Sequence, residues 1–299
     1  MKLLFKRSKS PTKTASKSDL RRQFALHLGA FTLFIAAFVL TVLILFPDQI
    51  LRARAEQLIF QQTGVRIDIG DLSLAPPLTL TLRNVAWQPE LDNWPPVRIP
   101  VIRISPIWGS LFGANPAAGV TAGFPVGSMQ GRMYKDGDLA TTLNAIGLAP
   151  FLPTEFPYPI QGVLSGNVDA SGDLSALRGQ AGFQLQLDRA AVSGLEALGA
   201  SEGRLSLGGI TLRGELQGRN LRIEELRTAD GDLLVEGRGT LLLAESPQAS
   251  RITAQIEITP TMTLDPNLAE LLLLTGVSPD RNGTYRLRLS GSLANPVLR

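Results

Sequence analysis

The sequence predicts a mainly β protein that begins with one membrane-spanning helix. Three observations lead to this expectation. A long uncharged apolar segment lies near the N-terminus, apolar and polar residues alternate from position 65 onward, and glycine-containing turns separate most of the alternating runs. Alternation with a period of two places every second side chain on the same face of a strand. The chain of 299 residues is long enough for one or two domains.

Basic residues concentrate ahead of the apolar segment. Residues 1–23 hold eight of the 29 lysines and arginines and one of the 26 acidic residues, which leaves 21 basic and 25 acidic residues in the rest of the chain. A slightly acidic body does not match the basic surface of a nucleic-acid-binding protein. We therefore expect no nucleic-acid partner, and we interpret residues 1–23 as a cytoplasmic tail.

The apolar segment is Phe24–Phe46, which contains 23 residues without a formal charge. As a helix it would rise roughly 34 Å, enough to cross a hydrocarbon core of about 30 Å. A cleaved signal peptide has a shorter core and small residues at its cleavage site, whereas Leu45-Phe46-Pro47-Asp48 ends this segment. We expect a single-pass anchor in the inner membrane, with the N-terminus in the cytoplasm and the following domain in the periplasm.

A short amphipathic helix is predicted over 47–64. Asp48 is suited to its N-cap and Gly64 to its end. Its apolar side chains share one face at helical spacing: Ile50, Leu51, Leu58 and Ile59. This face either rests on the bilayer surface or covers the edge of the sheet that follows, and we favour the sheet edge.

The β-rich domain is predicted over 65–299. A loop over 147–159 divides it into halves of 65–146 and 160–299. In the first half, strands are expected over 65–69, 78–87 and 97–104, with a slip or bulge at Pro100, and then over Gly127–Tyr134 and Leu139–Leu143.

The second half has the regular pattern of an antiparallel meander. Strands are predicted over Gly162–Ala170, Arg178–Leu187, Ala200–Leu207, Ile210–Gln217, Leu221–Arg227, Leu233–Leu243 and Ile252–Thr259. One helix interrupts them over Asn267–Leu274, where Asp265-Pro266 provides the cap. A final strand is expected over Thr284–Leu289.

Aromatic residues gather in the least regular part of the chain. They are Trp108, Phe112, Phe124, Phe151, Phe156 and Tyr158. We expect them to fill an irregular core.

The sequence contains few side chains that could form a catalytic or metal-binding site. There is no cysteine, and the single histidine, His27, lies in the apolar segment, so thiol, Ser-His-Asp and His-based zinc sites are excluded from the rest of the chain. Glu224-Glu225 is interpreted as part of a solvated face. The Asp-Gly-Asp turns at 136–138 and 230–232 lack the ligand set of a calcium loop. We predict no catalytic, cofactor-binding or metal-binding residues, no cofactor and no enzymatic activity.

Several patterns resemble the AsmA/TamB-like superfamily of envelope proteins. EQLIFQQTGVRIDIGDLSLAPPLTLTLRNV (Glu56–Val85) resembles its first helix and strands, and VRIPVIRISPIWGSLFG (Val97–Gly113) resembles the strand that follows. GITLRGELQGRNLRIEELRTADGDLLVEGRGTLLL (Gly209–Leu243) resembles its repeating meander, and YRLRLSGSLANPVLR its C-terminal pattern. The resemblance covers residues 24–299 as short patterns and is weakest over 114–160.

Within that superfamily, the length and C-terminal pattern are most similar to the protein N family of the type II secretion system. The resemblance implies an antiparallel, twisted sheet that forms an open groove. It also implies a non-enzymatic inner-membrane component with a structural or assembly role in the periplasm, in contact with other inner-membrane components of that system. The alternative is an AsmA-like protein that binds or transfers phospholipid along the groove. The two functions are compatible.

Overall fold

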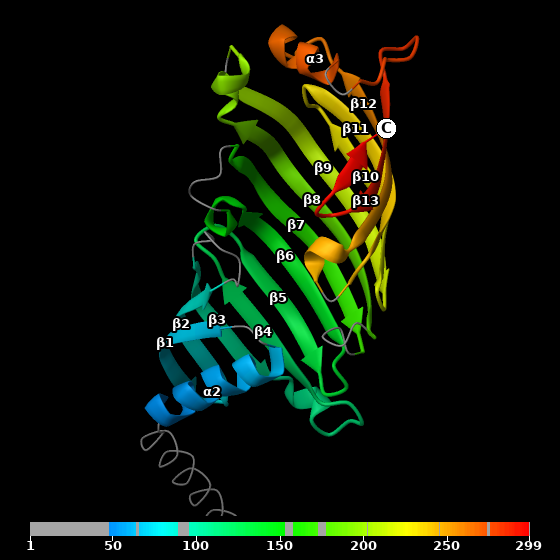
Figure 1. Ribbon diagram of the computed structural model, residues 1–299. Coiled ribbons are helices and arrows are strands. Elements are labelled where there is room, and N and C mark those ends of the chain that lie inside the picture. Colours follow the sequence, from blue (N-terminus) through cyan, green and yellow to red (C-terminus); the bar gives the residue numbers. More distant parts are fainter. Residues whose placement is uncertain are drawn as a thin grey trace, which may run out of the picture. The chain divides into compact units, whose positions relative to one another are not determined.

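The computed structural model describes residues 48–63, 66–88, 96–152, 158–172, 178–201, 203–244, 246–273 and 276–298. These residues form one open sheet of 14 strands, and every strand pairs antiparallel with the next strand in the sequence. In Figure 1 the strands β5 to β8 lie broadside to the viewer, while β10 to β13 turn edge-on, so the sheet twists and curls. The predicted mainly β fold with antiparallel strands is confirmed.

The elements follow one another in a simple meander. The strands are β1 (Arg66–Ala75), β2 (Thr79–Gln88), β3 (Val97–Pro106), β4 (Ala117–Gly123), β5 (Ser128–Tyr134), β6 (Leu139–Gly147), β7 (Ile160–Ser171), β8 (Gln180–Ser193), β9 (Arg204–Gln217), β10 (Asn220–Ala229), β11 (Leu233–Leu242), β12 (Arg251–Pro260), β13 (Tyr285–Ser292) and β14 (Pro296–Leu298). The helices are α2 (Asp48–Thr63) and α3 (Pro266–Leu273), with short 3₁₀ turns η1 (Trp108–Ser110), η2 (Ala149–Phe151), η3 (Leu195–Leu198) and η4 (Pro247–Ala249). Strand β6 pairs with β7, so the sheet continues from 65–146 into 160–299.

The predicted membrane helix Phe24–Phe46 lies outside the described residues. Of the helices within them, neither α2 nor α3 combines the length and the apolar character that crossing a membrane requires.

Three features of the sheet differ from the sequence prediction. The two strands expected over Ala200–Leu207 and Ile210–Gln217 are one strand, β9, because Gly208 does not turn the chain back. Gly208 has a φ of 65° and occupies a register shift opposite Ala229, so the strand continues through a bulge. Strands β4 and β14 were not predicted, since β4 is rich in Ala and Gly and β14 has three residues.

At Pro100 the buried apolar side chains switch between even and odd positions, although no extra residue is inserted into the strand. The pairs on both sides of Pro100 keep the same register between β2 and β3. The opposite residue, Asn84, has a φ of 52°. Before Asn84 on β2, the buried Leu82 stands at an even position. Beyond the position where Asn84 stands opposite Pro100, the buried residues Val85 and Val97 stand at odd positions. The expected slip or bulge at Pro100 is therefore a local reversal of side-chain direction in a continuous ladder.

Helix α2 covers the free edge of β1 with polar side chains. The Ile69 N–H donates to a carboxylate oxygen of Glu56 at 2.8 Å, and Arg52 donates to the Gly70 carbonyl at 3.0 Å and to Asp68 at 3.1 Å. Arg52 also pairs with Glu56 at 3.2 Å. These bonds satisfy backbone groups that β1 would otherwise leave open to another strand.

The preference for a helix on the sheet edge agrees with this contact, but only part of the predicted apolar face lies on the covered side. Leu51 and Leu58 are 38% and 48% exposed, whereas Ile59 is half-buried on the same side of the helix as Arg52 and Glu56. The half-buried side of α2 includes Arg52 and Glu56, because the backbone edge of a strand is polar and is satisfied by charged side chains.

Buried side chains gather near the two ends of the sheet. At the first end they come from β1 to β3: Ile69, Leu72, Leu82, Val85 and Val97. Toward the last strands, η3 and α3 form a second cluster from Leu195, Ala200, Leu264 and Leu268. The cap of α3 agrees with the sequence prediction, since Asp265 accepts the N–H of Asn267 at 2.8 Å. Helix α2 thus covers the first edge of the sheet, and η3 and α3 pack together in the second cluster.

We expect Glu56→Ala to open the edge of β1. The change removes the acceptor of the Ile69 N–H and the partner of Arg52, which costs about 1–2 kcal/mol of local stability. Hydrogen exchange measured by mass spectrometry should show faster exchange over β1. Gln57→Ala, at an exposed position on the same helix, is the matched control and should leave the exchange of β1 unchanged. Equal protection of β1 in both variants would contradict the edge-capping role.

We expect Asp265→Asn to lower stability in a pH-dependent way. The N–H of Ser201, and then that of Asn267, donate to Asp265 and lower its pKa below the ordinary value of 3.8. Because the folded pKa is the lower one, the stabilising effect is complete above the unfolded pKa and is lost as the pH falls through the folded pKa.

Thermal unfolding followed by circular dichroism tests this expectation. The deficit of Asp265→Asn relative to the wild type should be largest near neutral pH and should shrink as the pH falls below the ordinary carboxyl pKa of 3.8. Glu270→Gln, an exposed change on α3, serves as control. A deficit of the same size at every pH would show that the charge of Asp265 plays no part.

Candidate functional site

One face of the sheet is aliphatic from β7 to β12. Cross-strand pairs such as Leu185 with Leu212, Leu221 with Leu241 and Ile252 with Leu241 place these side chains on the same face. The face consists of Leu164, Val168, Phe183, Leu185, Leu187, Ile210, Leu212, Leu216, Leu221, Ile223, Leu226, Val235, Leu241, Ile252, Ile256 and Ile258. We call this set the apolar face.

No second layer of the described residues covers the apolar face. All sixteen of its side chains are half-buried, and none reaches the burial of Ile69 (0%) on β1 or Val97 (2%) on β3. An ordinary sheet packs such a face against helices or another sheet. The 14 strands span about 60 Å across the sheet at a strand spacing of about 4.8 Å. The sheet therefore offers a long, curved and partly exposed aliphatic surface.

Glycines let neighbouring side chains pack down onto this surface. On β11, Gly237 pairs with Ile256 and Gly239 pairs with Ala254, so the strand contributes no large side chain at these two positions. A Cβ at Gly214 on β9 would lie 2.7 Å from the ring of Phe183, and a Cβ at Gly237 would lie 3.3 Å from Cδ2 of Leu226. The side chains of Phe183 and Leu226 therefore occupy the space over these glycines.

A separate apolar hollow of about 390 Å³ lies at the end of the sheet where β3 and β5 finish. Its walls come from the turn before β2, the loop between β3 and β4, and the end of β5. The lining residues are Leu78, Leu80, Ile104, Pro106, Leu111, Pro116, Ala117, Ala118, Met133, Tyr134 and Lys135. Leu78 is 52% exposed and Met133 is 49% exposed, so the hollow is open to its surroundings.

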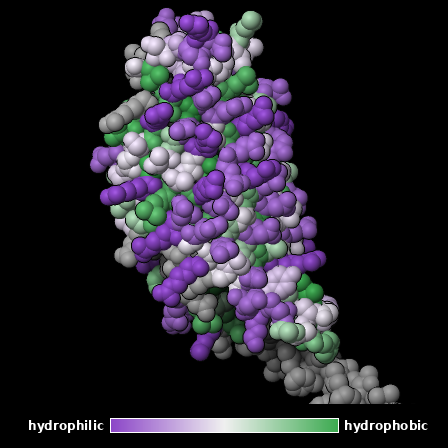
Figure 2. All heavy atoms as spheres, turned by 90° about the vertical axis from the view of Figure 1, so that its right-hand side faces the viewer, coloured by the Kyte–Doolittle hydropathy of each residue, from purple (hydrophilic) through white to green (hydrophobic). Residues whose placement is uncertain are grey.

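The opposite face of the sheet is polar. Figure 2 views the molecule from the side on which β10 to β13 lie in Figure 1, and the surface there is mostly hydrophilic. Along β11 the side chains of Glu236, Arg238 and Thr240 are exposed, while those of Val235 and Leu241 on the other face are half-buried. The sheet is therefore amphipathic over these strands.

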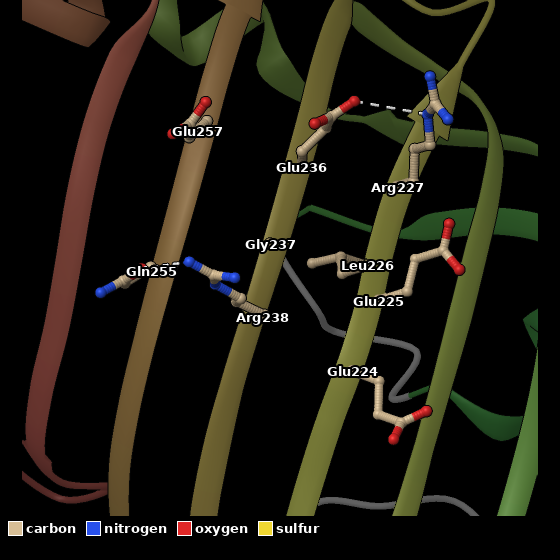
Figure 3. A pocket seen from close by; sticks show the side chains of 9 residues that line it. All are labelled: Glu224, Glu225, Leu226, Arg227, Glu236, Gly237, Arg238, Gln255 and Glu257. Atoms are coloured by element: carbon tan, nitrogen blue, oxygen red, sulfur yellow. Dashed lines mark hydrogen bonds and ion pairs between the residues drawn. The ribbon is translucent and has the colours of Figure 1, made fainter.

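A row of four charges crosses β10 to β13 on the polar face. Arg227 pairs with Glu236 at 3.5 Å, and Arg286 pairs with Glu257 at 3.3 Å (Figure 3 shows Arg227, Glu236 and Glu257). Glu236 and Glu257 stand directly opposite each other, so each carboxylate has an arginine on its outer side. These exposed pairs contribute at most about 1 kcal/mol each and help to hold the strand register.

Glu224 and Glu225 lie at a bulge on this polar face. Ile223 pairs with Gly239 and Leu226 pairs with Gly237, so both glutamates oppose the single residue Arg238. They line a shallow hollow of about 320 Å³ together with the charged row, as Figure 3 shows. This position fits the predicted solvated face.

The aspartates of the two Asp-Gly-Asp turns bind within the chain. Asp136 accepts from Asn115 at 2.6 Å. Asp232 accepts the Ser206 N–H and the Thr263 hydroxyl, both at 2.7 Å. Over the described ranges no group of acidic or histidine side chains is arranged to hold a metal ion. The two turns thus organise loops.

The predicted filling of a core by aromatic residues is only partly correct. Phe124 and Phe151 contact each other with ring centroids 5.5 Å apart, and Tyr158 packs on the cluster beside α3. Trp108 and Phe112, however, are 46% and 93% exposed, because they project from the loop between β3 and β4. Phe156 lies outside the described residues.

Searches of protein-family models, of curated proteins and of solved structures yield no match. The resemblance found in the sequence remains a prediction. The side chains of the apolar face are aliphatic or aromatic, so they can bind apolar groups by non-covalent contacts and have no group that would react with a ligand. The two-residue alternation of apolar residues in the sequence predicted most of the apolar face. It could not predict the exposure of Trp108 and Phe112, because these residues lie in a loop without such alternation.

Proposed function

We propose that the domain binds the acyl chains of lipids along the apolar face. The observation that supports this most directly is that sixteen aliphatic or aromatic side chains share one face and stay half-buried. Such a surface is costly in water and gains free energy when an apolar ligand covers it. An elongated ligand suits it better than a compact one, because the apolar face extends over the neighbouring strands β7 to β12.

The energy of this binding comes from many small contributions. Each methylene group moved from water to an apolar surface contributes about 0.8 kcal/mol, so a chain of many methylenes binds without any specific polar contact. The apolar face carries no charge, so the side chains of β7 to β12 do not select a particular headgroup. We infer a preference for acyl chains as a class.

The binding test uses residues 48–299, which form one compact unit. The purified domain should retain phospholipid or fatty acid through purification, detected by native mass spectrometry and lipid extraction. Replacing Leu185 and Leu212, which face each other on β8 and β9, by Asn should reduce the retained lipid several-fold.

A matched control changes the other face of the same two strands. Gln184 and Arg213 also pair directly, and replacing both by Asn should leave lipid retention unchanged. Circular dichroism of every variant verifies that the sheet is intact. A wild-type domain that retains no lipid and takes up none when lipid is added would refute the proposed function.

We also propose a role as a non-enzymatic inner-membrane component of the type II secretion system. The length, the apolar segment Phe24–Phe46 and the C-terminal pattern support it through resemblance. The uncapped last edge of the sheet adds a physical argument. Strand β14 pairs only with Leu289, Ser290 and Gly291, so among the described residues the edge of β13 over Tyr285–Arg288 carries no strand. A partner's strand would add along this edge, beside β14 and the open part of β13.

Deleting the gene should impair secretion and assembly of the inner-membrane complex. Complementation with the wild-type chain should restore both, whereas a chain with Val297→Lys and Leu298→Lys on the exposed β14 should restore them less well, because lysine on an edge strand disfavours strand addition. Secretion and assembly that continue unchanged after deletion would exclude this role and leave the lipid proposal to its own test.

A further inference from the structure

The loop between β3 and β4 exposes large apolar side chains. In residues 107–116, Phe112 is 93% exposed, Trp108 is 46% exposed and Leu111 is 41% exposed. No charged residue occurs between Arg103 and Arg132 in the sequence. Three neighbouring apolar side chains on a rigid loop are unusual on a surface that faces only water. We call residues 107–116 the apolar loop.

Ser110 holds the apolar loop in shape. Its hydroxyl donates to the Ile107 carbonyl at 2.7 Å and accepts the Ala117 N–H at 2.8 Å. The backbone N–H groups of Ser110 and Gly113 also bond within the loop, at 2.9 Å and 3.0 Å. These bonds satisfy backbone groups that would be costly to bring into an apolar medium, and they hold the exposed side chains outward before any partner is bound.

The apolar loop is continuous with the hollow beside it. Leu111 belongs to the loop and also lines the hollow of about 390 Å³, opposite Leu78 and Met133. Lys135 lines the same hollow, and its backbone N–H donates to the Pro116 carbonyl at 2.9 Å, so a cation stands beside the loop. An apolar tip with a nearby cation is the pattern of a segment that enters the headgroup region of a membrane.

We propose that the apolar loop inserts Trp108, Leu111 and Phe112 into the interfacial layer of a lipid bilayer. Tryptophan favours this layer because its ring is apolar and its N–H stays hydrated. A protein partner is the weaker candidate, since the loop has no charged side chain to orient one. The apolar segment Phe24–Phe46 of the same chain, expected to be an anchor, would hold the domain at such a surface.

This inference goes beyond lipid binding by the apolar face. The apolar face lies on β7 to β12, whereas the loop joins β3 to β4, so each can act without the other. Contact with the bilayer would bring the hollow that Leu111 lines against lipid. The loop would then be the place at which an acyl chain leaves or enters the membrane.

A single fluorescent label on the full-length chain tests the insertion. The chain has no cysteine, so Phe112→Cys provides a unique site for an environment-sensitive dye. Met262→Cys, at an exposed position before α3, is the matched control. Each labelled protein is reconstituted into vesicles of phosphatidylethanolamine and phosphatidylglycerol, with and without bromine on the acyl chains. Brominated lipid should remove roughly half of the emission at 112 and about none at 262.

A second measurement needs no label. Brominated vesicles should quench part of the tryptophan emission of the unmodified chain, and Trp108→Phe should remove the quenched part. Circular dichroism verifies the fold of each variant. Quenching at 112 that does not exceed quenching at 262 would overturn the proposal. A dye at 112 that is shielded from water but not quenched by brominated lipid would also overturn it, because the loop would then pack against protein, such as a second copy of the chain.

Lipid retention by the domain separates this inference from the proposed function. The Phe112→Cys chain should keep the lipid retention of the wild type, because position 112 is not on the apolar face. If the dye at 112 is not quenched but the domain retains lipid, only the loop inference is refuted. If the dye is quenched but the domain retains no lipid, only binding along the apolar face is refuted.

Discussion

The structure depends on one constraint: a wide antiparallel sheet has an aliphatic face that no second layer of the described residues covers. In most β proteins a second sheet or a set of helices removes such a face from water, and this burial supplies much of the stability. Here the side chains of β7 to β12 are half-buried by the curl of the sheet and by their own neighbours. The strand ladder and the two end clusters must therefore hold the fold, while the aliphatic face stays available.

The contacts near the ends of the sheet stabilise the fold and leave the apolar face uncovered. Helix α2 binds the edge of β1 through Arg52 and Glu56, and the cluster around Leu195 and Leu268 packs η3 and α3 beside the later strands. These contacts protect one edge and one end without crossing the apolar face. On the opposite side, Arg227 pairs with Glu236 and Arg286 pairs with Glu257 across β10 to β13, and these exposed charges keep that face in water. The two faces thus have different surroundings.

The sequence predicted the strands with strict alternation well. In β12 every second residue from Ile252 to Ile258 is apolar, and the structure places all four on one face, because the two-residue period is a direct consequence of the pleat. The cap at Asp265 was equally predictable, since a carboxylate before Pro at the first helical position has a defined geometry. Local rules were sufficient in these places.

The sequence could not predict features that arise from contacts between distant residues. Gly208 resembles a turn, but pairing with β8 and β10 keeps it inside one strand. Glu56 has no pattern that would mark it as the acceptor of the Ile69 N–H. The exposure of Phe112 depends on how Ser110 folds a ten-residue loop, and apolar composition alone suggested a core. The apolar face itself was visible as alternation, but its lack of a cover was not.

The accessibility of the apolar face tests the central claim most directly. In the cysteine-free chain, Val235→Cys places a dye on the apolar face of β11, and Glu236→Cys places it on the polar face one residue away. In the delipidated domain an aqueous quencher should reach both dyes, and added phospholipid should shield position 235 alone. A dye at 235 that the quencher fails to reach even without lipid would mean that the face is a closed core, which would contradict the account.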